Sequence, residues 1–552
     1  MDTSTTSTST TASSTSSGPD TAPPWSELVA AALLGAERRT PPGGSVAALL
    51  DAAAVATVRR RAGARPAAAR PLPEPAPHDP RPPLPAAAEH RLELLLTRGG
   101  AGGGGRRGTA PDLAELLPQW LAAANAHGYR APDAKLPALL DAARARTDLR
   151  PQTLLLTGPR GRWLARLNPD WKFALRDGGG RAGAAEPGSG GDGGADAEPS
   201  AEAVRARWEE GLFAERVTLL ASLRRRDPAA GLALLAGSWS TERAEDRLMF
   251  LDSLRDDLSQ EDEPFLEQAL ADRSRTVRAT AAELLSALPG SALAGRMARR
   301  AWSCVTLDGA AGGRIAVEAP HECDAAMQRD GVVPKPPSGR GERAWWLGQL
   351  VEATPLAAWT DRFGGRTPAE VVALPVADDW QRDLHAAWCL AAVRQRDAAW
   401  ARALLGAPGA SPASGPGDPA KLLAVLPPDE RARWAAHFIS AHGLSEAFRI
   451  LGVCAVPWTD PLGRAVMDAL EIARDAGSYP WSFSGVMGLA ERCLDPADAD
   501  RLALLAAVPD EPENGSPGAG SYWSEAFQRL VSTLRLRAAM GAELRDGAAI
   551  PD

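Results

Sequence analysis

The chain has 552 residues, of which 45% are hydrophobic and 24% are charged, as in a globular protein with a sizeable core. Its 61 basic and 69 acidic residues give a formal net charge of −8. This mild acidity argues against a nucleic-acid-binding protein with a basic stripe and against a polybasic membrane anchor.

The chain starts with a segment made mainly of serine and threonine, residues 1–17. This segment lacks the positive and apolar regions of a secretory signal. Residues 1–23 offer almost nothing apolar to bury and are predicted to be a disordered tail. The longest apolar runs, such as residues 28–34, fall far short of the about 18 residues that span a bilayer, so we expect no membrane segment.

Residues 24–177 are predicted to form an N-terminal helical region with Pro/Gly-rich insertions. Its first helix carries apolar residues at helical spacing, namely Trp25, Leu28, Val29, Ala32 and Leu33. The Pro/Ala-rich residues 62–88 and the Gly/Arg-rich residues 99–108 predict a linker and a loop. Residues 178–200 contain hardly any large apolar side chain, which predicts a flexible linker.

Residues 201–300 carry the clearest repeat. The apolar pattern predicts five short helices, over residues 212–223, 228–235, 242–254, 264–270 and 276–288. Leu235 and Leu270 each close the first helix of a pair, 35 residues apart. Leu254 and Leu288 close the second helices, 34 residues apart. A period of this length with two helices is typical of an α-solenoid, in which stacked pairs cover one another's apolar faces.

The segment 271–285 resembles the second half of a HEAT repeat. Asp272 lies in a turn and Arg278 follows a valine, as in the polar ladder that this repeat family builds between stacked units. The resemblance implies that Asp272 accepts hydrogen bonds from backbone N–H groups or from an arginine across the junction. Four residues are expected to face the core: Val277, Ala281, Leu284 and Leu288.

Residues 301–552 are predicted to be a C-terminal helical region with loops near residues 406–420 and 508–521. Ile315–Val317 is the only candidate strand. Four Asp-Pro pairs predict helix starts, because aspartate caps a free N–H and proline suits the first turn. These pairs begin at Asp227, Asp418, Asp460 and Asp495.

The tryptophans, the excess of arginine over lysine and the cysteines each lead to a further expectation. The 17 tryptophans predict interhelical packing, with an aromatic groove for a partner as the alternative. The examples near helices are Trp239, Trp345, Trp388, Trp400 and Trp434. Arginine greatly exceeds lysine, which suggests a GC-rich bacterial genome. The five cysteines are scattered without a C-x-x-C pair, which favours a reducing cytoplasm over a disulfide framework.

Three motifs stand out beyond the repeat. They are residues 25–29 with 32–35, residues 158–164 with 168–171, and residues 262–267 running into 272–274. Together they resemble a bacterial family of uncharacterised helical-repeat proteins, a domain of unknown function. Its members are often encoded beside a SWIM zinc-finger protein, a MoxR-type ATPase and a von Willebrand A-domain protein. The resemblance implies a part in a multi-protein assembly and supplies no catalytic residues.

Two further segments resemble ligand-binding motifs only in part. Residues 154–161 look like a phosphate-binding loop, but the required lysine and hydroxyl residue do not follow, so a tight turn between helices is predicted. Cys304, His321 and Cys323 could offer zinc ligands without a fourth ligand or paired spacing, so a polar turn is predicted. His437 and His442 lie five residues apart and therefore do not share a helix face.

Two clusters of ionisable residues could suggest catalysis. His385 and Cys389 lie four residues apart on an apolar helix, a spacing open to metal or nucleophile chemistry, although we favour a core position. The acidic residues before Pro264 are interpreted as a solvated helix start, where the helix dipole favours negative charge. They are Asp256, Asp257, Glu261, Asp262 and Glu263.

The sequence predicts an all-α protein, a HEAT-like α-solenoid of stacked antiparallel helix pairs. We expect a non-enzymatic scaffold or adaptor for protein partners, without catalytic, cofactor-binding or metal-ligating residues and without a small-molecule substrate. One alternative is an enzyme with a site around His385, Cys389 and Asp379. Another is a HEAT-like nucleic-acid-binding protein, which would gather its short arginine runs on one face. These runs are Arg59–Arg61, Arg224–Arg226 and Arg299–Arg300.

Overall fold

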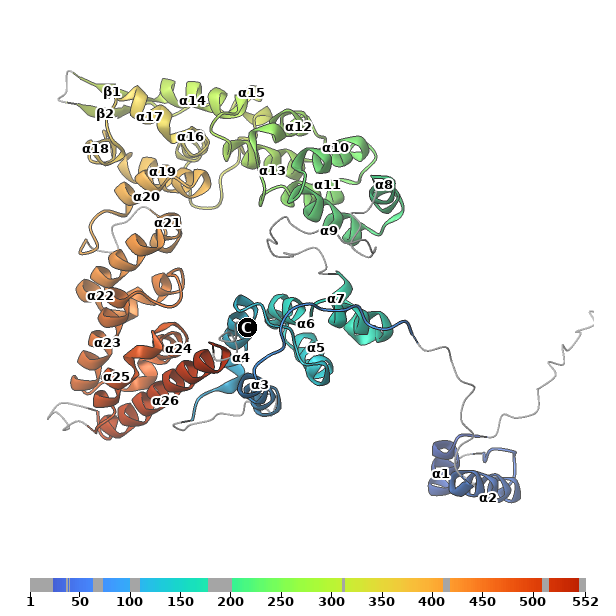
Figure 1. Cartoon of the computed structure of the whole chain (residues 1–552). Coiled ribbons are helices and arrows are strands. Elements are labelled where there is room, and N and C mark those ends of the chain that lie inside the picture. Colours follow the sequence, from blue (N-terminus) through green and yellow to red (C-terminus); the bar gives the residue numbers. More distant parts are fainter. Residues whose placement is uncertain are drawn as a thin grey trace, which may run out of the picture. The chain divides into compact units, whose positions relative to one another are not determined.

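The computed structural model describes residues 23–35, 38, 40–62, 73–99, 110–176, 201–309, 313–410, 417–508 and 516–545. The predicted tail (except Pro23) and the predicted linker 178–200 lie outside these residues. Helix accounts for 69% of the described residues, which agrees with the predicted all-α class. The chain divides into two compact units, residues 1–75 and 76–552 (Figure 1).

The smaller unit contains two described helices, α1 (Trp25–Leu34) and α2 (Val46–Ala62). The predicted helix at residue 25 is confirmed, but its predicted buried face is correct only in part. Leu28 is buried together with Ala31, whereas Leu33 is 81% exposed. A pair of short helices covers only a narrow strip of each partner, so most of the apolar face remains in solvent.

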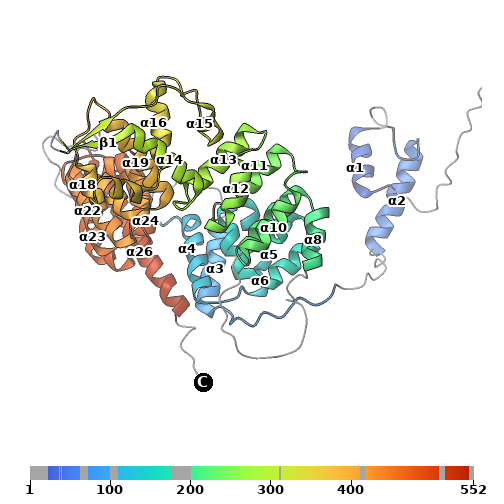
Figure 2. The same cartoon turned by 90° about the horizontal axis from the view of Figure 1, so that it is seen from above.

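The larger unit begins with five helices that share a core with the end of the chain. These helices are α3 (Ala86–Gly99), α4 (Leu113–Ala126), α5 (Leu136–Ala145), α6 (Arg150–Leu167) and α7 (Phe173–Arg176). Met540 and Leu544 of α26 (Ala519–Arg545) are buried in this core. Two views show α3 and α4 beside the end of α26 (Figure 1, Figure 2). Arg91 and Glu543 form an ion pair of 2.6 Å across this contact.

The predicted repeat region is helical as expected. Its helices are α8 (Ala201–Glu210), α9 (Phe213–Arg224), α10 (Pro228–Ser238), α11 (Ala244–Asp252), α12 (Glu263–Ala269), α13 (Arg275–Ser286) and α14 (Ala292–Cys304). The five predicted helices correspond to α9–α13, with ends that differ by at most three residues. The four leucines that define the period are all buried: Leu235, Leu254, Leu270 and Leu288.

A small antiparallel sheet follows α14. The predicted strand at Ile315–Val317 lies in β2 (Arg314–Val317), whereas its partner β1 (Val305–Asp308) was not predicted. Ile315 is buried and also forms a bridge to Val376, so the hairpin is attached to a segment 60 residues further along the chain. This long-range pairing explains why the short strands are stable without a longer β-pattern.

The remaining helices complete the core of the larger unit. They are α15 (Ala325–Arg329), α16 (Glu342–Glu352), α17 (Leu356–Arg362), α18 (Pro368–Val372), α19 (Gln381–Gln395), α20 (Ala398–Leu405), α21 (Pro419–Val425), α22 (Pro428–Leu451), α23 (Asp460–Asp475), α24 (Ser484–Cys493) and α25 (Ala499–Leu505), before α26. Trp388 packs between two other tryptophans, with ring centroids 5.9 Å from Trp359 and 5.3 Å from Trp400. The predicted interhelical role is confirmed for Trp388 and Trp400, which are fully buried.

The Asp-Pro pairs act as helix starts with one exception. Asp227 and Asp418 cap α10 and α21, and Asp495 caps the short 3-10 helix that leads into α25. In contrast, Thr459 occupies the cap position of α23 and Asp460 is the first helical residue. Asp460 instead pairs with Arg464, one helical turn further on.

Arginines of the larger unit, in helices or in the turns next to them, join segments that are separated by at least one other helix in the sequence. We call them junction arginines, and each pairs with a carboxylate at least 25 residues away in sequence. The pairs are Arg216–Glu242, Arg224–Asp262, Arg247–Asp272, Arg255–Glu283, Arg296–Glu267, Arg394–Glu352, Arg402–Glu430, Arg501–Asp468 and Arg529–Glu491. The planar, five-donor guanidinium suits such two-pronged contacts better than an ammonium does.

The pair Arg224–Asp262 corrects the interpretation of the acidic residues before Pro264. Asp262 is not solvated: its side chain is 2% exposed, and that of Arg224 is 0% exposed. The two Nη atoms of Arg224 donate to the two carboxylate oxygens of Asp262, each at 2.8 Å. Gly231 of α10 leaves room for this arginine, because a Cβ atom there would lie 2.7 Å from its Cγ.

Replacement of Arg224 by methionine tests this buried pair. The variant retains an apolar stem but leaves the Asp262 carboxylate buried without its partner, so we expect the free energy of unfolding to fall by about 3–5 kcal/mol. Arg402→Met is the matched control, because the side chains of Arg402 and Glu430 are 53% and 26% exposed and the pair should contribute about 0–1 kcal/mol. Urea unfolding followed by tryptophan fluorescence measures both, and equal losses would contradict the special role of Arg224.

Candidate functional site

The junction between α12 and α13 contains the two residues singled out by the HEAT resemblance. The Asp272 carboxylate accepts a hydrogen bond from the Ser274 N–H at 2.8 Å and pairs with Arg247 of α11 at 3.0 Å. Both kinds of partner expected for Asp272 are therefore present. Arg278 behaves differently, because its Nη1 donates to the main-chain oxygens of Asp272 and Arg273, at 2.7 and 3.1 Å.

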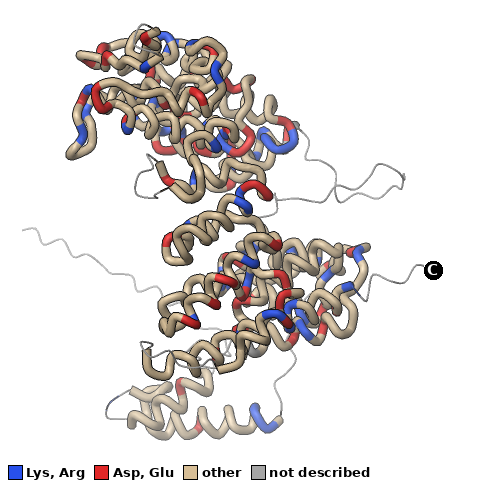
Figure 3. Tube along the Cα trace, turned by 90° about the vertical axis from the view of Figure 1, so that its left-hand side faces the viewer, with Lys and Arg blue, Asp and Glu red and all other residues tan. Residues whose placement is uncertain are grey.

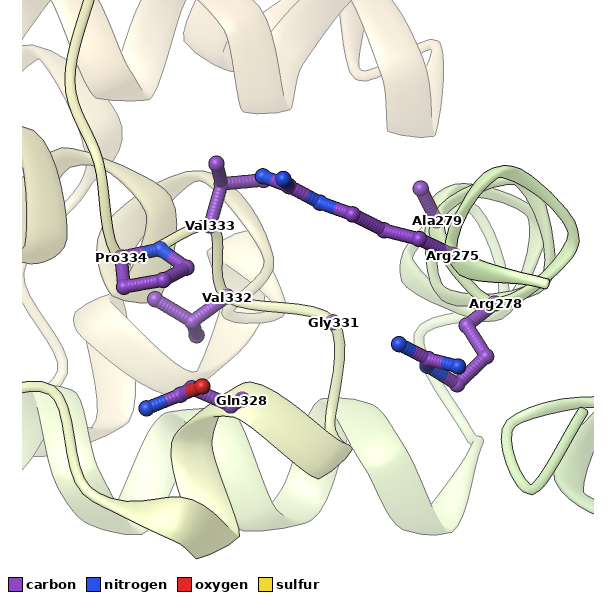
Figure 4. A pocket seen from close by; sticks show the side chains of 8 residues that line it. All are labelled: Arg275, Arg278, Ala279, Gln328, Gly331, Val332, Val333 and Pro334. Carbon is purple, nitrogen blue, oxygen red and sulfur yellow. The ribbon is translucent and has the colours of Figure 1, made fainter. Parts of the chain in front are cut away.

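A cavity of about 180 Å³ lies directly beside this junction. One wall is the start of α13, which contributes Arg275, Arg278 and Ala279. The other wall is the end of α15 and the loop that follows it, through Gln328 and residues 331–334. Figure 4 shows the Arg275 side chain extended across the cavity towards Val333, with Arg278 on the α13 side.

The loop wall is held by the side chains of α16. The indole Nε1 atoms of Trp345 and Trp346 donate to the main-chain oxygens of Val333 and Pro334, each at 2.7 Å. The Gln349 side chain accepts from the Val333 N–H at 2.8 Å. Because these hydrogen bonds hold the main chain of Val333 and Pro334, this wall of the cavity is in place without a ligand.

A glycine brings the loop against α13. Gly331 has a φ of 92°, a left-handed conformation that favours glycine. A Cβ atom at this position would lie 2.3 Å from the Cβ of Ala282. The close approach of Gly331 to α13 therefore determines the width of the cavity at this end.

The lining of the cavity is positively charged. It contains two guanidinium groups and no carboxylate. The nearest acidic residues in sequence are already engaged, since Asp272 pairs with Arg247 and Asp330 pairs with Arg296 and Arg300. Among the described residues Arg275 has no hydrogen-bond or ion-pair partner, so its charge is available to a ligand.

Sequence reasoning identified Arg278 but missed the cavity. Arg275 and Arg278 are three residues apart at the start of a helix, which places them on one face. That spacing is the only feature of the local sequence that indicates a site shared by the two arginines. The opposite wall comes from residues about 50 positions later, and nothing in the pattern of residues 328–334 predicts where this loop folds.

The predicted alternative site at His385 and Cys389 lies in the core. Cys389 is buried, and burial raises the pKa of its thiol to about 12. Burial also lowers the pKa of His385, whose ring lies 5.6 Å from that of Trp388. Asp379 is exposed in the turn before α19. A thiol that stays protonated at neutral pH is a poor nucleophile.

The possible zinc ligands do not assemble into a site. Cys304 is buried at the end of α14, with a thiol pKa raised mainly by burial. His321 is exposed and its Nε2 lies 3.2 Å from the Glu318 carboxylate. Within the described ranges no group of three His, Cys, Asp or Glu side chains could hold a metal ion.

Gly158 confirms the predicted tight turn in place of a phosphate-binding loop. It has φ 54° and ψ −140° and kinks α6. Arg81 stabilises the kink, because it donates to the main-chain oxygens of Leu155 and Leu156 at 2.7 and 3.1 Å. Asp79 holds Arg81 through two hydrogen bonds of 2.9 and 2.7 Å. Burial raises the Asp79 pKa, but the contacts with Arg81 outweigh it and the net shift is downward.

His442 belongs to the pair of histidines that lie five residues apart. Its Nε2 is 3.0 Å from the main-chain oxygen of Pro408, and its ring packs 4.6 Å from that of Phe438. The helix that contains both histidines is interrupted at Gly443, which has a φ of 79°. These contacts give His442 a structural role at the end of a helix.

Comparison with known proteins identifies the family. The family of unknown function DUF5691 matches residues 27–544, and the chain belongs to this family. No curated protein and no solved structure matches the chain. None of the described helices combines the length and apolar character needed to cross a bilayer.

Replacement of Gly158 by alanine tests the turn. A Cβ atom there would lie 2.2 Å from Nη2 of Arg81, whereas the same change at Gly128 meets no atom within 4 Å. Both glycines have positive φ, so Gly128→Ala should cost about 1–2 kcal/mol of stability through the backbone alone. Gly158→Ala should cost at least ~1 kcal/mol more, because it displaces hydrogen bonds of a charged group. Equal losses in thermal unfolding would refute the role of Arg81.

Alkylation tests the burial of the cysteines. Cys323 is the partly exposed cysteine, whereas Cys389 is buried. At pH 8 a thiol with a pKa of about 12 is ionised in only about one molecule in ten thousand. Iodoacetamide should therefore label Cys323 first and Cys389 only after unfolding, as measured by mass spectrometry. Rapid labelling of native Cys389 that His385→Ala abolishes would support the His–Cys alternative.

Proposed function

We propose that this DUF5691 protein is a non-enzymatic, HEAT-like α-solenoid that serves as a scaffold or adaptor for protein partners. The observation that carries the proposal is the cavity beside the α12–α13 junction. It combines rigid walls with two arginines and contains no nucleophile, general acid or general base in its lining. Such a site suits recognition of a partner better than catalysis.

The repeat architecture supports the same proposal. Buried Leu235 and Leu270 lie 35 residues apart, buried Leu254 and Leu288 lie 34 apart, and junction arginines connect helices that are not adjacent in sequence. Stacked helix pairs of this kind form extended surfaces that bind partners. The family resemblance suggests a MoxR-type ATPase or a von Willebrand A-domain protein as the partner. The free cysteines fit a cytoplasmic, bacterial protein.

The two alternatives receive less support. An enzyme built on His385 and Cys389 would need a reactive thiol, but burial raises the Cys389 pKa to about 12. A nucleic-acid-binding surface would need arginines gathered on one face. Figure 3 instead shows basic and acidic residues interspersed along the helices in that view. Moreover, Arg224 of one predicted basic run is buried against Asp262.

Reconstitution with the suggested partners tests the scaffold. The purified chain should form a stoichiometric complex with the MoxR-type ATPase or the von Willebrand A-domain protein from its own genome, measured by size-exclusion chromatography with light scattering. Cys389→Ala, checked for native circular dichroism, should leave that complex intact, because the thiol is buried and has no part in binding. If neither protein binds the folded chain, the proposed partners are wrong.

A further inference from the structure

We propose that the cavity between α13 and residues 328–334 binds the carboxylate of an acidic side chain, preferably glutamate, on a protein partner. This inference rests on the proposed function and names the chemistry of its partner. We call the site the Arg275–Arg278 cavity.

The positive charge of the cavity lining favours an anionic ligand. Two guanidinium groups line it without a carboxylate, and the acidic residues closest to it in sequence pair with other arginines. Arg278 uses Nη1 for two main-chain oxygens, and its Nε and Nη2 have no partner among the described residues. Arg275 likewise has no partner in the described part of the chain. These unused N–H groups can form charge-assisted hydrogen bonds with an oxyanion.

The size and the walls of the cavity restrict the anion. A volume of about 180 Å³ is below the roughly 300–1,000 Å³ of sites for whole small-molecule ligands. It can accept a side chain that enters from a partner. Ala279, Val333 and Pro334 provide apolar surface next to the arginines, which suits the methylene stem of glutamate (Figure 4).

The position of the Arg278 charge and of the opposite wall is set before binding. Asp272 and Arg273 carbonyls hold Arg278, while Trp345 and Trp346 hold the opposite loop. A site that is ordered in advance loses little conformational freedom when a ligand enters. Planar carboxylates match the guanidinium fork, so the available N–H groups can bind a carboxylate through paired hydrogen bonds.

Fluorescence anisotropy with the full chain tests the inference. The probe is a fluorescein-labelled, amidated peptide of alternating glutamate and glycine, compared with its glutamine counterpart and with inorganic phosphate as competitor. We expect the glutamate peptide to bind and the glutamine peptide not to bind. Arg275→Gln and Arg278→Gln should each weaken binding about 10-fold to 100-fold, as expected for loss of a charged hydrogen bond.

Two further variants separate the cavity from general attraction. Ala279→Leu leaves the charge unchanged and fills the cavity from an exposed helical position, so it should also abolish binding. Arg299→Gln removes the same charge from an exposed position of α14 outside the lining and should change the affinity by less than about twofold. Equal losses in Arg299→Gln and Arg275→Gln, or full binding by Ala279→Leu, would overturn the inference. Binding of phosphate but not of the glutamate peptide would also overturn it.

Failure here can be distinguished from failure of the scaffold. If the glutamate peptide does not bind while the reconstituted partner complex still forms, the carboxylate site is wrong and the scaffold function stands. If the peptide binds as expected but neither suggested protein forms a complex, the carboxylate site stands and the identity of the partner is wrong.

Discussion

The arrangement of the larger unit depends on arginine–carboxylate pairs between helices that are not adjacent in sequence. Arg224 is the extreme case, because its charge is removed from water and is balanced by Asp262 and by the main-chain oxygen of Asp257. Desolvation of both ions offsets much of their attraction, so such a pair adds little net stability over an apolar contact. The paired hydrogen bonds between Arg224 and Asp262 require a strict geometry, however. The pair therefore determines how α9 lies against the start of α12.

The same constraint prepares the Arg275–Arg278 cavity. Because the Asp272 carboxylate pairs with Arg247, Arg278 donates to main-chain oxygens instead. Its remaining N–H groups stay available. Since Arg296 and Arg300 take Asp330, the loop after α15 brings no negative charge into the cavity. The positive lining is therefore a consequence of how the neighbouring carboxylates are already paired. No separate basic motif is needed.

One helix joins the first and last parts of the larger unit. Residues such as Trp523 and Leu534 of α26 belong to the large core, and Met540 and Leu544 belong to the core of α3–α6. Tyr129 donates to the main-chain oxygen of Leu544 at 2.8 Å, which fixes the N-terminal helices of this unit to its last turn. The larger unit is therefore a connected framework from α3 to α26.

Residues within a few positions of one another were enough to predict the helices. Apolar spacing, Asp-Pro caps and the leucine period depend on contacts inside one or two helices, and α9–α13 match the prediction closely. The turn at Gly158 was also predictable, because the motif lacked the residues that phosphate binding requires. The helical class, the turn and the absence of a phosphate-binding motif therefore follow from local sequence.

The pairing of distant charges could not be predicted in the same way. Sequence proximity favoured a solvated Asp262 and gave Asp272 an arginine partner without naming it, whereas the folded chain buries Asp262 with Arg224 and selects Arg247 for Asp272. Many arginines compete for each carboxylate, and their spacing in sequence does not rank them. Only packing of the helices selects the partner, because an ion pair forms where the backbone brings two side chains within reach and excludes water.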